Sequence, residues 1–230
     1  MFAAPRVQRH WLAVLAAIAW ASVALQFYSS LSRDFAFVSL LGRIVDVLSY
    51  FTITSNILLA MVATVGAQQG SDGKPLASPG ALTATAVYIF VVAVTYAALL
   101  KSRAHLVGWP AVWADFGLHE LTPVLYLAYW LMFVRKDRLT WRQPAVWLIY
   151  PAAYIAYTLA RGALIHRYPY YFANAGALGY PRALFNGALF LLGFWLLGLG
   201  AVALGRVKRL SAPQLCSRSV SEAKRLSRES

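Results

Sequence analysis

The stretch from Ser49 to Val65, SYFTITSNILLAMVATV, decides the class of fold of this chain. Its second half is apolar except for Thr64, and the apolar run around it begins at Gly42. Its first half places two serines, two threonines and an asparagine in that run, where each polar group needs a partner away from water. The stretch therefore predicts a membrane-spanning helix and raises the question of what its polar half does.

Only 13% of the 230 residues are charged, and apolar runs recur along the chain. A helix needs about 20 apolar residues to cross the ~30 Å hydrocarbon core of a bilayer. We therefore predict an all-α membrane protein with six transmembrane helices, at residues 11–28, 42–66, 81–100, 116–134, 145–162 and 183–204. Pro123 and Pro151 lie inside two of these runs and predict kinks. We expect one transmembrane domain over residues 1–205, followed by a basic, disordered tail over residues 206–230.

The 21 lysine and arginine residues predict the orientation of the chain. Six spans place both termini on one side, and that side carries 14 of the 21: two before residue 11, one in the 67–80 loop, four in the 135–144 loop and seven after residue 205. The positive-inside rule therefore predicts cytoplasmic termini. We attribute the net charge of +13 mostly to this asymmetry and to attraction of the basic residues to anionic lipid headgroups. We do not interpret it as a sign of nucleic-acid binding. The single cysteine, Cys216, lies in the tail and cannot form an internal disulfide.

Ionisable side chains within spans are costly and are candidates for function. Those in or near the predicted spans are Asp46, Asp115, His119, Glu120 and Arg161. At 1.5 Å per residue, Thr52, His119 and Arg161 all fall in the outer half of the bilayer. Helical spacing also predicts three polar stripes: Ser49, Thr52 and Asn56; Asp115, His119, Thr122 and Tyr126; and Tyr150, Tyr154, Tyr157 and Arg161. Together they predict an enclosed polar pocket that opens toward the outer leaflet.

Each of these residues also has a structural interpretation. Serine, threonine and asparagine often only hydrogen-bond a neighbouring helix, at about 0.6 kcal/mol per contact. His119 near the interface can be a structural histidine, Arg161 can extend to the headgroups, and the tyrosines can form an interfacial belt. The residues by themselves indicate a buried polar site of unknown purpose.

Four segments resemble a known family: SYFTITSN (49–56), HELTPVLYLAYWLMFV (119–134), WLIYPAAYIAYTLARG (147–162) and YPYYFANAGALGY (168–180). They are similar to a family of bacterial six-helix membrane proteins that is distantly similar to the androgen-induced membrane proteins of animals. The bacterial likeness covers about residues 49–180, whereas the animal likeness rests on the six-span plan and two positions. The resemblance implies a protein of the bacterial cytoplasmic membrane.

The animal proteins are intramembrane threonine hydrolases that cleave fatty acid esters of hydroxy fatty acids. The resemblance thus implies a lipid-ester hydrolase that needs no cofactor or metal and whose partners are membrane lipids. By motif, Thr52 matches the nucleophile and His119 the base that takes its proton. Thr54 is a rival, which points about 200° away from Thr52 on a helix. Asp115 either orients His119, as in a triad, or caps the start of its helix.

The other site residues are inferred from chemistry. Asn56, Tyr157 and Arg161 are candidate donors to the oxyanion. Arg161 or Arg167 is the candidate partner for a free carboxylate of the substrate. A nucleophile about 10 Å deep would meet an ester partway along an acyl chain without extraction of the lipid.

Three other classes compete with a hydrolase. A lipid- or small-molecule-binding protein or transporter would use Asp46, Asp115, Glu120 and Arg161, although no internal repeat of the kind many transporters carry is visible. A metal-dependent hydrolase would need a better ligand set than one histidine and scattered carboxylates, because catalytic zinc sites offer three protein ligands. A purely structural membrane protein is the last alternative.

Overall fold

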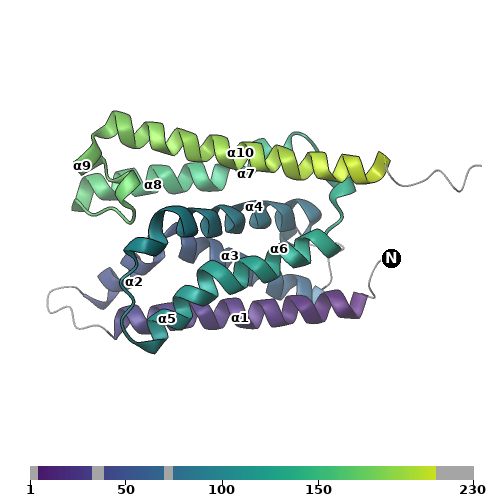
Figure 1. Cartoon of the computed structure of the whole chain (residues 1–230), viewed down its shortest axis with the longest axis horizontal. Helices are drawn as coiled ribbons and strands as arrows, with labels where there is room; N and C mark the ends of the chain where they lie inside the picture. The colour runs from purple at the N-terminus through teal and green to yellow at the C-terminus, as the bar shows by residue number, and fades with distance from the viewer. Residues whose placement is uncertain (1–4, 33–38, 70–74, 211–230) are drawn as a thin grey trace, which may run out of the picture.

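The structure, a computed structural model of the chain, describes residues 5–32, 39–69 and 75–210, and all regular elements in these ranges are helical (Figure 1). The long helices are α1 (Pro5–Leu31), α3 (Phe51–Gln69), α4 (Pro79–Thr95), α6 (Thr122–Phe133), α8 (Ile149–Ile165) and α10 (Tyr180–Leu210). The shorter α-helices are α2 (Leu40–Leu48), α5 (Gly108–Phe116), α7 (Gln143–Trp147) and α9 (Ala175–Leu178). Single turns are the π-helical η2 (Tyr96–Leu100) and η4 (Gly117–Leu121) and the 3-10 turns η1 (Pro75–Ala77), η3 (Lys101–Arg103), η5 (Lys136–Arg138) and η6 (Tyr171–Ala173).

The long helices run side by side, with α3, α4 and α6 between α1 and α10 (Figure 1). Helix α1 contacts α3 and α6, and α4 contacts α3, α6 and α10. The first residues of α1 and the last residues of α10 lie at one end of the bundle, whereas α2, the start of α5 and α9 lie at the other. We refer to the latter as the α2–α9 end.

The core between these helices is apolar, and some of its polar groups are paired across helices. Leu59 and Ile89 are fully buried. The hydroxyl group of Tyr126 donates to Leu82 O at 3.0 Å, and Trp130 Nε1 donates to the hydroxyl of Thr83 at 3.0 Å. Where no water is available, as in a hydrocarbon environment, polar groups need partners of this kind within the protein.

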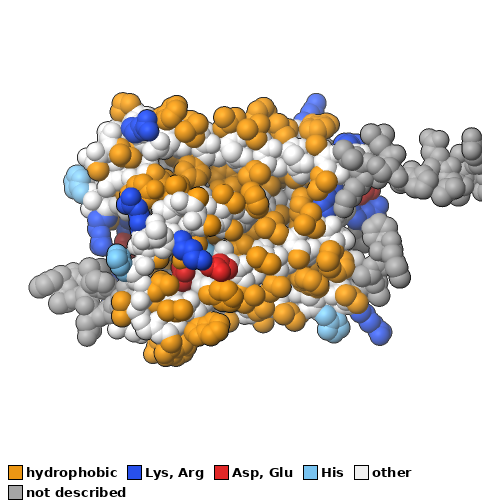
Figure 2. Space-filling model, in the orientation of Figure 1, with side chains coloured by type: hydrophobic (Ala, Val, Ile, Leu, Met, Phe, Trp, Pro, Cys, Tyr) orange, Lys and Arg blue, Asp and Glu red, His pale blue; other side chains and the backbone are white. Residues whose placement is uncertain are grey.

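Within the described residues, five helices are long and apolar enough to cross a membrane: Arg6–Leu31, Phe51–Gln68, Pro79–Arg103, Gln143–Ile165 and Tyr180–Arg206. The surface agrees with their composition, because α10 exposes large apolar side chains such as Leu189, Leu192 and Leu196. In Figure 2, hydrophobic side chains extend along the visible face and lysine and arginine side chains gather toward its ends. Soluble monomers rarely expose such continuous apolar surface. The fold is all-helical and compatible with an integral membrane protein.

Two of the six predicted spans differ from the structure. The span predicted at 42–66 is interrupted, because α2 ends at Leu48 and α3 begins at Phe51. The span predicted at 116–134 lies inside a longer helical run of α5, η4 and α6 that starts at Gly108. This run is not one of the five apolar helices, since polar residues in its middle lower its hydropathy.

Both predicted proline kinks coincide with changes in the helices. Pro123 is the second residue of α6, just after the π-helical turn η4, and Pro151 lies in the first turn of α8, next to its junction with α7. The missing proline N–H accounts for both interruptions. Helix α10 extends to Leu210, past the domain end predicted at residue 205. The rest of the predicted tail, with Cys216, lies outside the described residues.

Candidate functional site

Several polar groups of the SYFTITSN stretch, both side chains and a backbone carbonyl, are hydrogen-bonded to tyrosines of α8. Tyr154 donates to Ser49 O at 2.8 Å, and Tyr150 donates to the hydroxyl of Thr54 at 2.8 Å. Tyr150 Oη also lies 3.1 Å from Ser55 Oγ. These bonds join neighbouring helices, which is the structural interpretation of such residues. Thr54, the rival nucleophile, belongs to this contact.

Thr52 instead lines a cavity of about 440 Å³ at the α2–α9 end, and His119 lines the same cavity. The cavity wall is formed by α1, the α2–α3 junction, η2, η3, α5, η4 and the chain before η6. The structure thus brings together the two residues that the resemblance selects, although they belong to α3 and η4. Asp115 lines this cavity too.

His119 is held by two neighbours. Its Nδ1 lies 3.0 Å from the backbone carbonyl oxygen of Asp115 and 3.1 Å from Asp115 Oδ1. The hydroxyl group of Tyr96 donates to the same carboxylate. A proton on Nδ1 that is donated to Asp115 leaves Nε2 as an acceptor. In the described part of the chain, Nε2 has no hydrogen-bond partner. The helix begins at Gly108, so Asp115 does not cap its start, and this geometry favours the orienting interpretation.

Two π-helical turns bring this cluster together. Tyr96 is the first residue of η2, and His119 is the middle residue of η4. Such turns are rare and frequently occur at functional sites. Turn η4 also packs unusually close to α1: a Cβ atom on Gly117 would lie 2.1 Å from Ser22 Oγ. Glycine is therefore required at position 117 for this approach.

Asn56, a predicted oxyanion donor, is fully buried and binds backbone carbonyls instead. Its Nδ2 donates to Thr52 O at 2.9 Å and to Leu118 O at 3.3 Å. In η4, the N–H of Thr122 bonds to the carbonyl five residues earlier. The next bond in this register would join residue 123 to Leu118 O, but Pro123 has no N–H. Asn56 supplies the missing donor and so ties α3 to η4.

The predicted common stripe of Ser49, Thr52 and Asn56 is wrong, because the chain leaves the helical geometry between Leu48 and Phe51. Each of the three side chains faces a different neighbour. Ser49 contacts α8, Thr52 lines the cavity, and Asn56 contacts η4.

Thr52 lies in the first turn of α3, where backbone N–H groups have no partner within the helix. Its N–H donates to Tyr170 Oη at 3.4 Å. Burial raises the pKa of Tyr170 to about 12, and hydrogen bonds to Thr52 oppose that rise. The Tyr170 phenol therefore stays protonated near pH 7 and is a hydrogen-bond donor. Among the described residues, no hydrogen bond joins the Thr52 hydroxyl to His119.

Thr52 also lines a second, smaller cavity of about 80 Å³, which lies among α4, α8 and α10. Thr52, Leu100 and Tyr170 belong to the walls of both cavities. The smaller cavity has no charged side chain in its wall and is lined mainly by aromatic and aliphatic groups. The hydroxyl of Thr52 therefore stands where a polar space meets an apolar one.

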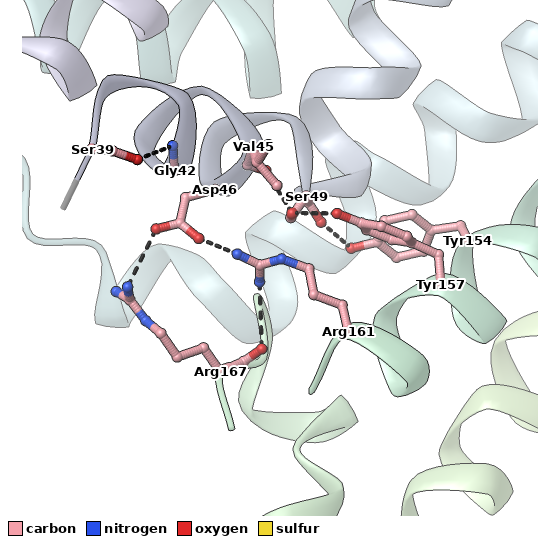
Figure 3. A network of polar contacts seen from close by, with 9 residues as sticks. All are labelled: Ser39, Gly42, Val45, Asp46, Ser49, Tyr154, Tyr157, Arg161 and Arg167. Carbon is pink, nitrogen blue, oxygen red and sulfur yellow. Dashed lines mark hydrogen bonds and ion pairs between the residues drawn. The ribbon is translucent and has the colours of Figure 1, made fainter. Parts of the chain in front are cut away.

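Arg161, Arg167 and Tyr157 belong to a separate polar network, in which Asp46 lies between the two arginines (Figure 3). Asp46 accepts hydrogen bonds from Arg161 and, at 3.3 Å, from Arg167. Tyr157 Oη lies 2.8 Å from Ser49 Oγ. None of these three predicted site residues is in the wall of the His119 cavity. Their geometry offers no support for oxyanion or substrate-carboxylate roles.

Tyr96, Arg103 and Tyr170 are among the residues of the cavity wall that sequence patterns did not predict. Arg103 is exposed, and its guanidinium lies 4.3 Å from the centre of the Tyr171 ring. No ion pair joins it to an acidic side chain within the ranges that the structure describes. Tyr170 lies in the YPYY motif, but its spacing gave no indication of a role in the site. Tyr96 and Arg103 lie outside the four segments that resemble the bacterial family.

The acidic and histidine side chains do not form an obvious metal centre. Over residues 5–32, 39–69 and 75–210, no group of three or more histidine, cysteine, aspartate or glutamate side chains is placed to hold a metal ion. The site consists of His119, the carboxylate of Asp115 and the hydroxyl groups of Thr52, Tyr96 and Tyr170 around one cavity.

Comparison with known proteins yields no relative: no family model, curated protein or solved structure matches the chain. The resemblance to the six-helix bacterial family therefore stays a prediction.

Proposed function

We propose that this protein is an intramembrane lipid-ester hydrolase in which Thr52 is the nucleophile and His119 the base. The observation that carries the proposal is that Thr52 and His119 line one cavity. A hydroxyl group becomes an effective nucleophile when a neighbouring base takes its proton and a third group orients that base. Asp115, 3.1 Å from His119 Nδ1, is the orienting group.

In the proposed reaction, Thr52 Oγ1 attacks the ester carbonyl carbon while His119 Nε2 takes the hydroxyl proton, directly or through one water. The carbonyl oxygen becomes negative and receives a hydrogen bond from the Tyr170 hydroxyl, whose oxygen accepts from the Thr52 N–H. Cleavage of the C–O bond releases the alcohol, which takes the proton from His119. A water molecule, deprotonated by His119, then hydrolyses the acyl ester on Thr52 and restores both residues.

The proposal places six spans in the bacterial cytoplasmic membrane, with the run of α5, η4 and α6 as the fourth. We place the termini in the cytoplasm because the terminal segments and the loops on their side carry the excess of lysine and arginine. One of these loops contains η5, which packs against α10. Exposed tryptophans suit two interfacial belts: Trp109 and Trp113 on α5, and Trp141 after η5. The His119 cavity then opens in the outer half of the bilayer.

An impermeant maleimide tests this orientation in intact cells. Cys216 of the natural chain should react only after permeabilisation. Ala104→Cys, made together with Cys216→Ser, should react without it because residue 104 lies in the cavity wall at the α2–α9 end. The reverse pattern would put the termini outside.

The substrate we propose is a membrane lipid with an ester partway along its chains, such as an ester of a hydroxy fatty acid. Such a bond lies below the headgroups, where Thr52 meets it without removal of the lipid from the membrane. Arg103, rather than Arg161 or Arg167, is placed to pair with an anionic group of the substrate, because it lines the same cavity as His119.

The proposal is tested with a fluorophosphonate lipid probe on the purified, folded protein, with mass spectrometry to locate the adduct. Wild type should be labelled on Thr52. The adduct should disappear in Thr52→Ala and in His119→Ala. Thr54→Ala is the matched control, because Thr54 lies two residues away in a helix–helix contact.

Hydrolysis of a hydroxy fatty acid ester should follow the same order as labelling. Labelling that persists in Thr52→Ala, or that is lost equally in Thr54→Ala, would exclude Thr52 as the nucleophile. A complete lack of labelling and hydrolysis in folded wild type would favour binding or transport of a lipid instead.

A further inference from the structure

The apolar cavity among α4, α8 and α10 is the feature that the proposed reaction leaves unexplained. Its wall includes Phe51, Ile155, Phe190 and Phe194, and none of its lining residues carries a charge. Each water-sized group needs roughly 10–15 Å³ of such free space. A cavity of about 80 Å³ therefore has room for about five to eight such groups, which a methylene matches in size.

The position of the cavity restricts what can occupy it. Because Thr52 and Tyr170 line it as well as the polar cavity, a chain inside it ends next to the Thr52 hydroxyl. We infer that this cavity binds the alkyl part of an acyl group whose carbonyl lies at Thr52 and Tyr170. The identity of the bond that reacts there rests on the proposed function, whereas the binding of the chain does not.

Gly187 is the residue that keeps part of this space open. It lies on α10 in the cavity wall, and a Cβ atom added there would lie 3.2 Å from Ile155 Cγ2 of α8. A larger side chain at position 187 must therefore enter the cavity or displace Ile155. Thr158, which is buried in the same wall, offers a second position for the same change.

A control substitution exists on the same helix. Gly193 of α10 has no atom within 4 Å of an added Cβ, and it is not in the wall of this cavity. Gly193→Leu thus adds the same side chain to α10 at a position outside the wall of this cavity.

The test uses octanoic acid with a terminal diazirine, cross-linked to the full-length protein in detergent, with adducts located by mass spectrometry. Wild type should be labelled on cavity-wall segments of α8 and α10. Gly187→Leu and Thr158→Leu should each reduce these adducts at least tenfold, whereas Gly193→Leu should not. Adducts on lipid-facing residues such as Leu192, or wall adducts unchanged in both Gly187→Leu and Thr158→Leu, would overturn the inference.

His119→Ala separates the two proposals: His119 is not in the wall of the apolar cavity, so this variant should abolish ester hydrolysis but retain the octanoic acid adducts. Where wild type hydrolyses p-nitrophenyl esters, Gly187→Leu should also shift the preferred acyl chain toward shorter lengths than in Gly193→Leu. Adducts in the wall without any hydrolysis would leave the acyl site in place and reject only the reaction.

Discussion

The imidazole ring of His119 lies flat against the phenol ring of Tyr96, with the ring centres 3.8 Å apart and an angle of 13° between the planes. The two residues belong to different π-helical turns, and both contact the carboxylate of Asp115. Stacking against Tyr96 and the contact of Nδ1 with Asp115 therefore fix the position of the imidazole ring.

This arrangement predicts how two substitutions next to His119 affect hydrolysis. Asp115→Asn should lower kcat roughly 10³–10⁴-fold, because an amide favours the wrong imidazole tautomer. Tyr96→Phe keeps the stacked ring and removes one hydrogen bond to a charged group, so kcat should fall only about tenfold. Both are measured with the ester that wild type hydrolyses. Wild-type kcat in Asp115→Asn would contradict the orienting role.

The contact between Tyr170 and Thr52 predicts a loss in kcat for Tyr170→Phe. Loss of one oxyanion donor should lower kcat roughly 10²-fold and change KM little. Tyr171→Phe is the control, because its exposed ring stays under Arg103, and the Thr52 N–H bonds to the hydroxyl of Tyr170. Equal effects of the two substitutions would indicate a general disturbance of the chain before α9.

The bond from Asn56 to Leu118 O predicts a coupling with Pro123. Asn56→Ala leaves a buried carbonyl without a donor and should destabilise the protein by about 1–3 kcal/mol. In a Pro123→Ala background, the new N–H at residue 123 can bond to that carbonyl, so the loss should be smaller. Thermal unfolding in detergent of wild type, the two single variants and the double variant measures the difference. Strictly additive effects would show that the two residues do not share this carbonyl.

The network around Asp46 predicts a structural role for Arg161. The side chains of Asp46 and Arg161 are 30% and 12% exposed, so each loses a partner in a partly buried site when the other is replaced. Asp46→Asn should destabilise the protein by about 1–3 kcal/mol, while kcat per folded molecule stays near that of wild type. A Michaelis constant that rises strongly in Arg161→Gln, without loss of stability, would restore the substrate-binding role predicted from sequence.

The parts of the site that sequence patterns predicted depend on local spacing. Asp115 and His119 are four residues apart on one helical run, so their contact follows from the period of the helix. The stripe of Tyr150, Tyr154, Tyr157 and Arg161 also held, because α8 is continuous over all four and presents them to α2, α3 and their junction. The stripe on the second predicted span failed, since its residues lie on both sides of a helix break.

The sequence is sufficient to predict that this chain forms long apolar helices. It also predicts which side chains within one helix share a face. Both follow from composition and from a period of 3.6 residues, which act within a single helix. Other contacts are visible only in the tertiary structure. Thr52 lines the His119 cavity, Asn56 binds η4, and Asp46 pairs with Arg161. Tyr96 and Tyr170 complete the site. These contacts join residues of different helices, and their geometry depends on the break before α3, on two π-helical turns and on a glycine that lets η4 approach α1.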